Sequence, residues 1–205
     1  MNEHDLMYAS EEDKAFYNKC IQGLASHAGD RGDGFDADGV QIPYSCGAHS
    51  LRCFRQAFDY IGKPILILEI GTNLCCSSAM MLELSPKSTI VTCDITKKKE
   101  TADSVKVMNE RYGDRFNYLN RNEKYFLDKV KDKNIQFGLC FVDGGHLIDD
   151  VIKDTELCLD LKIPYILYDD FLPQFGDIQE AIKTFGDKLE QIFVNGNIAL
   201  YQVKI

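Results

Sequence analysis

Three aspartates stand at the ends of two apolar runs in the second half of the chain. Asp143 ends residues 136–143, and Asp169 and Asp170 end residues 164–170. Short apolar runs of this kind are typical of strands that are buried on both faces of a parallel sheet. Because parallel strands end at one edge of their sheet, we expect these carboxylates to lie close together. Carboxylates that share a dry cleft need a cation, and a hard divalent ion such as magnesium suits oxygen ligands.

A metal site is one of two interpretations of these acids. Asp143, Asp169 and Asp170 are the predicted metal ligands. The alternative is that Asp169 and Asp170 cap a helix and bind a loop without any metal. Asp143 is also a candidate for contact with a cofactor, because Gly144 and Gly145 leave open backbone beside it.

His146 follows Asp143 within the same segment. The pKa of a histidine lies near neutrality, so its side chain can accept a proton as a general base. His146 and Asp143 are therefore the predicted catalytic residues. The alternative role for His146 is structural, at the start of a helix where it positions a loop.

A second polar group surrounds the turn after the apolar run 65–70. Glu69 lies near the end of this run, and Gly71 permits a tight turn and close approach of a ligand to the backbone. A strand, a glycine turn and a helix form the nucleotide-site layout of open α/β sheets, where ligands lie at the carboxyl ends of the strands. Asp94 ends the next run, 23 residues beyond Gly71, near where a ribose-binding acid is expected.

The turn argues against the common phosphate-containing ligands. It has one glycine where a dinucleotide site has three, and no Gly-Lys-Ser or Gly-Lys-Thr follows it. An acid before the glycine would repel phosphate, but it suits an ammonium group and hydroxyls. S-adenosylmethionine has both groups and no phosphate, so it is the predicted cofactor. The candidate cofactor-binding residues in this part of the chain are Glu69, Gly71, Thr72, Asn73, Ser77 and Asp94.

The elements that must position these residues alternate along the chain. After a looser helical pattern over residues 1–28, strand-like runs alternate with predicted helices at 49–61, 77–84, 100–112, 122–131 and 148–159. Asn195-Gly196 between the last two runs is a strong hairpin signal. This order predicts an α/β fold, a Rossmann-like three-layer sandwich whose mostly parallel seven-stranded sheet is closed by an antiparallel C-terminal hairpin.

Composition and charge limit the partners. The 205 residues are 45% hydrophobic and 27% charged, which is ordinary for one soluble globular domain. The net charge of −9 argues against binding to nucleic acid or to an anionic membrane surface. No apolar run is long enough to span a bilayer, the N-terminus lacks signal-peptide features, and the eight cysteines form no C-x-x-C pair. We therefore expect a cytoplasmic protein with reduced thiols.

Four segments together give the chain a resemblance to a known family. They are residues 68–72, 91–94, 141–146 and 166–171. Over residues 50–205 the chain resembles the class I S-adenosylmethionine-dependent methyltransferases, especially the small catechol-type and macrolide-sugar O-methyltransferases. The resemblance implies transfer of a methyl group to a hydroxyl of a small-molecule acceptor, with a divalent metal at the matching acids that binds the acceptor oxygens. It also implies adenine contacts at residues 120–122, which adds Asn122 to the candidate cofactor-binding residues.

The chain is predicted to form a single methyltransferase-like domain. Residues 1–60 would form an N-terminal helical cap and loop, and residues 61–205 the cofactor-binding core. The sequence departs from the family in the turn after the first strand, where Leu74, Cys75 and Cys76 occupy the region of a second glycine. The alternative is therefore a non-catalytic or diverged S-adenosylmethionine-binding protein of the same fold. Assembly into a homo-oligomer is left open by the sequence.

Overall fold

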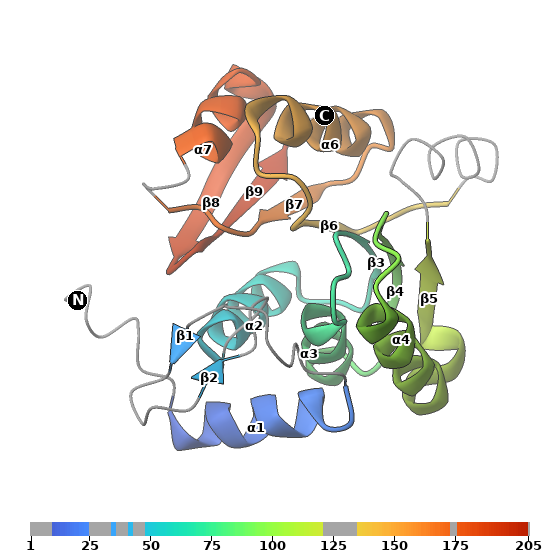
Figure 1. The fold of residues 1–205 in the computed structure, drawn as a ribbon. Helices are drawn as coiled ribbons and strands as arrows, with labels where there is room; N and C mark the ends of the chain where they lie inside the picture. Colours follow the sequence, from blue (N-terminus) through green and yellow to red (C-terminus); the bar gives the residue numbers. More distant parts are fainter. Residues whose placement is uncertain are drawn as a thin grey trace.

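Two layers of helices enclose one central sheet (Figure 1). The structure is a computed structural model of the chain, and it describes residues 10–24, 34–35, 41–42, 48–120, 135–172 and 176–204. Outside the central sheet, β1 (Gly34–Phe35) and β2 (Gln41–Ile42) pair as a small antiparallel ladder. Within the described ranges, no helix is long and apolar enough to cross a membrane.

The central sheet has seven strands in the order β5-β4-β3-β6-β7-β9-β8. These strands are β3 (Leu66–Ile70), β4 (Thr89–Cys93), β5 (Phe116–Leu119), β6 (Leu139–Val142), β7 (Tyr165–Tyr168), β8 (Leu189–Asn195) and β9 (Ile198–Val203). Strands β3 to β7 run parallel, β9 is antiparallel to β7, and β8 is antiparallel to β9. The predicted mostly parallel sheet with a C-terminal hairpin is confirmed.

Helices cover both faces of this sheet (Figure 1). One face carries α1 (Glu11–Ile21), α2 (Ala48–Ile61), α3 (Cys76–Leu84) and α4 (Lys99–Tyr112), and the other carries α6 (Ile148–Asp160) and α7 (Gly176–Lys183). Short 3-10 turns, η2 (Gly113–Arg115) and η5 (Gly186–Lys188), lead into β5 and β8. The arrangement confirms the predicted three-layer sandwich.

The central strands are apolar because both of their faces are buried. In β3, Ile67 packs into the cluster beneath α1 to α4, whereas its neighbour Leu68 packs into the cluster beneath α6 and α7. Side chains of a strand alternate between its faces, so one continuous apolar run fills two separate cores. The run therefore fixes β3 in the middle of the sheet, where its carboxyl end adjoins those of β4 and β6.

The N-terminal region differs most from expectation. The pattern over residues 1–28 predicts one helix, but α1 begins at Glu11, where the Ser10 hydroxyl accepts the N–H of Asp13 (3.1 Å). The helix predicted over residues 122–131 lies outside the described residues. The division into a cap of residues 1–60 and a core of residues 61–205 stays a prediction.

Candidate active site

Four neighbouring strands end at one edge of the sheet, and acids lie at or just past their ends. These acids are Glu69, Asp94, Asp143, Asp169 and Asp170. Asp143 stands in the middle: its N–H donates to Ile70 O (2.9 Å), and the N–H of Asp169 donates to Val142 O (3.0 Å). Burial raises the pKa of Asp143 well above its usual value, and the charges of the four other acids raise it further. The crowding of acids at this edge therefore disfavours the simultaneous ionisation of all of them.

The turn after β3 lies directly against the end of β6. Gly71 has a φ of 92°, and its N–H donates to Cys93 O (2.9 Å). A Cβ at this position would lie 1.9 Å from Asp143 O, so no side chain fits there. The geometry thus contains the tight turn expected at Gly71, while its contact with a cofactor stays a prediction.

Asp94 holds the same turn from the β4 side. Its Oδ2 accepts the N–H groups of Thr72 (3.0 Å) and Asn73 (2.8 Å), and its Oδ1 accepts the N–H of Thr96 (2.7 Å). The Thr72 side chain is only 2% exposed and bonds to the hydroxyl of Thr92. Because a carboxylate has about four acceptor positions, these three donors leave capacity for a ligand hydroxyl.

Glu69 lies beneath the turn. Its side chain is fully buried, and its carboxylate accepts hydrogen bonds from the hydroxyls of Ser77 and Ser78 at the start of α3. Burial raises the pKa of Glu69 to about 7, although the bonds from Ser77, Ser78 and Thr92 oppose that rise. This arrangement ties β3 to α3. Direct contacts of Glu69 and Ser77 with a cofactor stay predictions. The hydrogen bonds between the Glu69 carboxylate and the two serines do not support them.

The three residues in place of a second glycine turn away from solvent. Leu74 and Cys75 are fully buried, and Cys76 is 2% exposed, all within the core cluster beneath α3. Cys75 takes the left-handed conformation (φ 66°, ψ 17°) that glycine usually supplies. The turn therefore has the left-handed conformation that a glycine would give it, and its three larger side chains point into the core.

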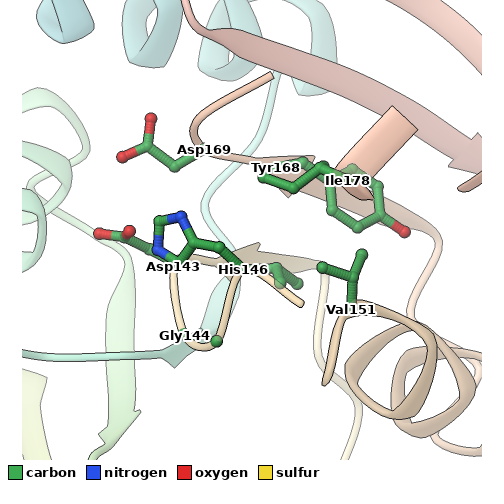
Figure 2. A pocket seen from close by; sticks show the side chains of 9 residues that line it. Asp143, Gly144, His146, Val151, Tyr168, Asp169 and Ile178 are labelled. Carbon is green, nitrogen blue, oxygen red and sulfur yellow. The ribbon is translucent and has the colours of Figure 1, made fainter. Parts of the chain in front are cut away.

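His146 and Asp143 lie in one pocket. Figure 2 shows this pocket, which is also lined by Gly144, Val151, Tyr168, Asp169 and Ile178. His146 Nδ1 lies 3.0 Å from Asp170 Oδ2. The hydrogen bond to Asp170 raises the pKa of His146, while partial burial opposes the rise. His146 therefore has the orienting partner that a general base needs.

Asp169 has a partner that the sequence did not indicate. Its side chain is 6% exposed, and its Oδ1 accepts a hydrogen bond from Asn197 Nδ2 (2.7 Å). Burial raises the pKa of Asp169 to about 7, and the charge of Asp170 adds to the rise. Asn197 lies in the turn between β8 and β9, so its position beside Asp169 comes from the order of the strands in the sheet, which the sequence around Asn197 does not encode.

These contacts do not form the predicted metal site. Among the described residues, no group of three or more His, Cys, Asp or Glu side chains is placed to hold a metal ion. Asp169 and Asp170 instead face Asn197 and His146. Each contact occupies one oxygen of its carboxylate, and metal binding by Asp143, Asp169 and Asp170 stays a prediction.

Two further predictions concern the loops after β4 and β5. Asn122 lies outside the described residues. Its neighbour Asn120 donates to Tyr118 OH (3.0 Å) and to Thr96 O, so it supports the loop that follows Asp94. Ile95, which the sequence did not single out, is 73% exposed directly after Asp94. In the sequence, the only sign of this exposed side chain is its place directly after Asp94, the acid that ends a predicted strand.

Comparison with known proteins supports the fold independently. No protein-family model matches the sequence, and no curated protein matches it. Solved structures do match. An O-methyltransferase from Bacillus cereus in complex with SAH has 15% identity and a TM-score of 0.64, with 93% of this chain and 91% of that chain covered.

Two more solved structures agree with this match. An SAH-bound methyltransferase from Podospora anserina has 17% identity and a TM-score of 0.62, with 97% of each chain covered. The O-methyltransferase TomG from Streptomyces achromogenes, in complex with SAM, has 14% identity and a TM-score of 0.62, with 98% of this chain and 93% of that chain covered. The chain therefore has the Rossmann-like fold of these methyltransferases.

Proposed function

We propose that the chain is an S-adenosylmethionine-dependent methyltransferase that acts on a hydroxyl of a small molecule. The observation that carries the proposal is the edge of the sheet where the Gly71 turn, Asp94 and Asp143 lie beside the His146 and Asp170 pair. Solved proteins of the same fold were crystallised with SAM or SAH. Their ligands support S-adenosylmethionine as the cofactor here.

The residues around the Gly71 turn suit the parts of this cofactor. Asp94, with spare acceptor capacity, would bind the ribose hydroxyls, and the exposed Ile95 beside it would pack against the adenine. The backbone of Gly71 and Asn73 would face the methionine part of the cofactor. Burial and four neighbouring acids raise the pKa of Asp143, and the positive charge of the cofactor would favour its ionised carboxylate again. No lysine or arginine lines this pocket in the described residues, so the cofactor would supply the compensating charge.

The His146 and Asp170 pair would activate the acceptor. When bound, S-adenosylmethionine supplies a methyl group on a positively charged sulfur. His146 would take the proton of the acceptor hydroxyl as the oxygen attacks that methyl group, while Asp170 holds the imidazole in place and stabilises its charged form. The pocket would hold the two reactants side by side, which lowers the entropic part of the barrier.

Assistance by a divalent metal is a second candidate for the same acids. The raised pKa values of Asp143 and Asp169 favour it, because a bound cation would relieve the repulsion between their charges. Asp169 and Asp170 would offer the metal the carboxylate oxygens that do not contact Asn197 and His146. Thermal unfolding with and without magnesium chloride tests it: stabilisation of the wild type that is absent in Asp169→Asn would support the metal.

The proposal is tested by methyl transfer from radiolabelled S-adenosylmethionine to a panel of catechols, phenols and sugars. We expect at least one acceptor to become labelled, with SAH as the second product, and the rate to fall about 100-fold in His146→Asn. Asp149→Asn, an exposed acid in the first turn of α6, is the matched control and should retain the rate. Tight cofactor binding without turnover of any acceptor would favour the non-catalytic alternative.

A further inference from the structure

The hairpin turn between β8 and β9 contacts the loop that follows β7 at two points. Asn197 Nδ2 donates to Asp169 Oδ1 (2.7 Å), and the N–H of Phe171 donates to Asn197 O (2.7 Å). Asp169 is also tied to β6, because its N–H donates to Val142 O (3.0 Å). Asn197 therefore holds the residues on both sides of Asp170, one through its side chain and the other through its backbone.

Asp170, between these two contacts, has an unusual backbone conformation. Its φ is 51°, in the left-handed region that residues other than glycine rarely adopt. Its carbonyl oxygen accepts the N–H of Leu172 (2.7 Å), which closes a tight turn. In this conformation Asp170 Oδ2 lies 3.0 Å from His146 Nδ1. Such a conformation persists only where the surrounding contacts hold it, and the two contacts of Asn197 flank the residue that adopts it.

The side-chain amide of Asn197 is oriented by Asp169. Its Nδ2 faces the carboxylate, and its Oδ1 is buried without a hydrogen-bond partner among the described residues. A buried acceptor without a partner is costly, so the contact with the carboxylate has to outweigh that cost. The side chain of Asp169 is 6% exposed, which keeps water from competing for the same bond. The contact between the two side chains therefore fixes this corner of the hairpin turn.

The other asparagine of the hairpin contacts a different element. Asn195, the last residue of β8, donates from Nδ2 to Gln56 Oε1 (3.1 Å) at the surface of α2. The thiol of Cys53, also in α2, donates to Asn195 O (3.0 Å). Asn195 and Asn197 are two residues apart in the chain but have different partners. Asn195 is thus a matched control for substitutions of Asn197.

We propose that Asn197 is a positioning residue, whose contacts with Asp169 and Phe171 hold the loop after β7 so that the carboxylate of Asp170 faces His146. Its effect on methyl transfer rests on the proposed function, whereas its effect on the orientation of Asp170 does not. Asn197→Ala removes the contact with Asp169 and keeps the backbone contact with Phe171. The loop then holds Asp170 less firmly, and His146 loses part of its orienting contact.

The orientation is tested by NMR spectra of the wild type, Asn197→Ala and Asn195→Ala at a single pH. We expect the ring nitrogen signals of His146 and the backbone amide signal of Asp170 to shift or broaden in Asn197→Ala. Both should keep their wild-type positions in Asn195→Ala. If Asn197→Ala does not fold, Asn197→Ser replaces it, since serine keeps a polar side chain in the turn. Unchanged signals in the Asn197 variant, or equal changes in Asn195→Ala, would overturn the proposal.

A double-mutant cycle then separates an effect through Asp170 from a general loss of stability. In Asn197→Ala we expect kcat to fall about tenfold while the KM for S-adenosylmethionine changes less than about threefold. In an Asp170→Asn background the same substitution should lower kcat less than about twofold, because the carboxylate that Asn197 orients is already absent. A tenfold loss in both backgrounds, or wild-type kcat in Asn197→Ala, would overturn the positioning role. If the wild type neither binds the cofactor nor transfers methyl groups, the proposed function fails, and the NMR spectra still decide the orientation.

Discussion

Individual carboxylates at the candidate site mostly hold other groups in place. Asp94 binds three backbone N–H groups, Glu69 binds two serine hydroxyls, and Asp170 pairs with His146. The sequence predicted their location at strand ends, because parallel strands share one edge. It did not predict their partners, because those depend on loop paths. Asn197 reaches Asp169 only through the order of the last two strands.

The pair of His146 and Asp170 predicts a pH dependence. The hydrogen bond to Asp170 raises the pKa of His146, so more of the imidazole is protonated at neutral pH and unable to accept a proton. Activity should therefore rise with pH as His146 loses its proton. In Asp170→Asn the pKa should fall and the rise should move to lower pH, with a lower maximum rate.

The pH–rate profiles of both proteins, together with NMR titration of the His146 ring, check this prediction. Asp149→Asn, whose exposed carboxylate lies in the first turn of α6, is the control and should keep the wild-type profile. Identical profiles in the wild type and in Asp170→Asn would exclude His146 as the base whose protonation limits the rate.

Gly71 should tolerate no side chain. In Gly71→Ala the new Cβ would lie 1.9 Å from Asp143 O, and alanine at a φ of 92° adds backbone strain. We expect a loss of about 3 kcal/mol in the free energy of unfolding. Gly176→Ala, where nothing lies within 4 Å of the added Cβ, should change it by less than about 0.5 kcal/mol. Equal effects in urea denaturation would contradict the tight turn.

At the scale of elements, α1 is attached to α2 by a buried acid. Asp13 is 4% exposed and contacts Arg52 Nε (3.1 Å), Arg55 and Ser10. The apolar pattern of α1 is loose, which is why its extent was predicted poorly. An acid on the inner face of a helix is not readable from periodicity, because its partners lie about 40 residues away on another helix.

Asp13→Ala should release α1 from α2. Burial alone would raise the pKa of Asp13, but its hydrogen bonds to Ser10, Arg52 and Arg55 lower the pKa below the usual value. Its contribution is thus present at neutral pH and lost as the pH falls below about 4. We expect Asp13→Ala to lower the free energy of unfolding of α1 by about 2 kcal/mol. The loss is no larger because both arginines are partly exposed to solvent.

Hydrogen exchange of α1 amides measures this loss. Glu11→Ala removes the exposed pair with Lys14 and should cost less than about 0.5 kcal/mol. Equal protection of α1 in the wild type and in Asp13→Ala at pH 7 would show that apolar packing alone attaches the helix.

At the scale of the whole molecule, the order of elements was predictable and the chemistry only partly so. Alternating apolar runs and the Asn195-Gly196 signal were enough for the sheet and its antiparallel end, which the structure confirms. The carboxylates of Asp143, Asp169 and Asp170 were expected to converge on a metal. Asp169 and Asp170 also have protein partners, Asn197 and His146, which lie far from them in sequence and were not predicted, while metal binding stays a prediction.

Calorimetric titration with S-adenosylmethionine tests the central claim most directly. We predict saturable binding to one site, weakened about tenfold or more in Asp94→Asn, and unchanged in Asp149→Asn. NADH should give no binding heat, because the Gly71 turn lacks the glycines of a dinucleotide site. The absence of detectable binding at millimolar S-adenosylmethionine, or binding of NADH in its place, would contradict the account.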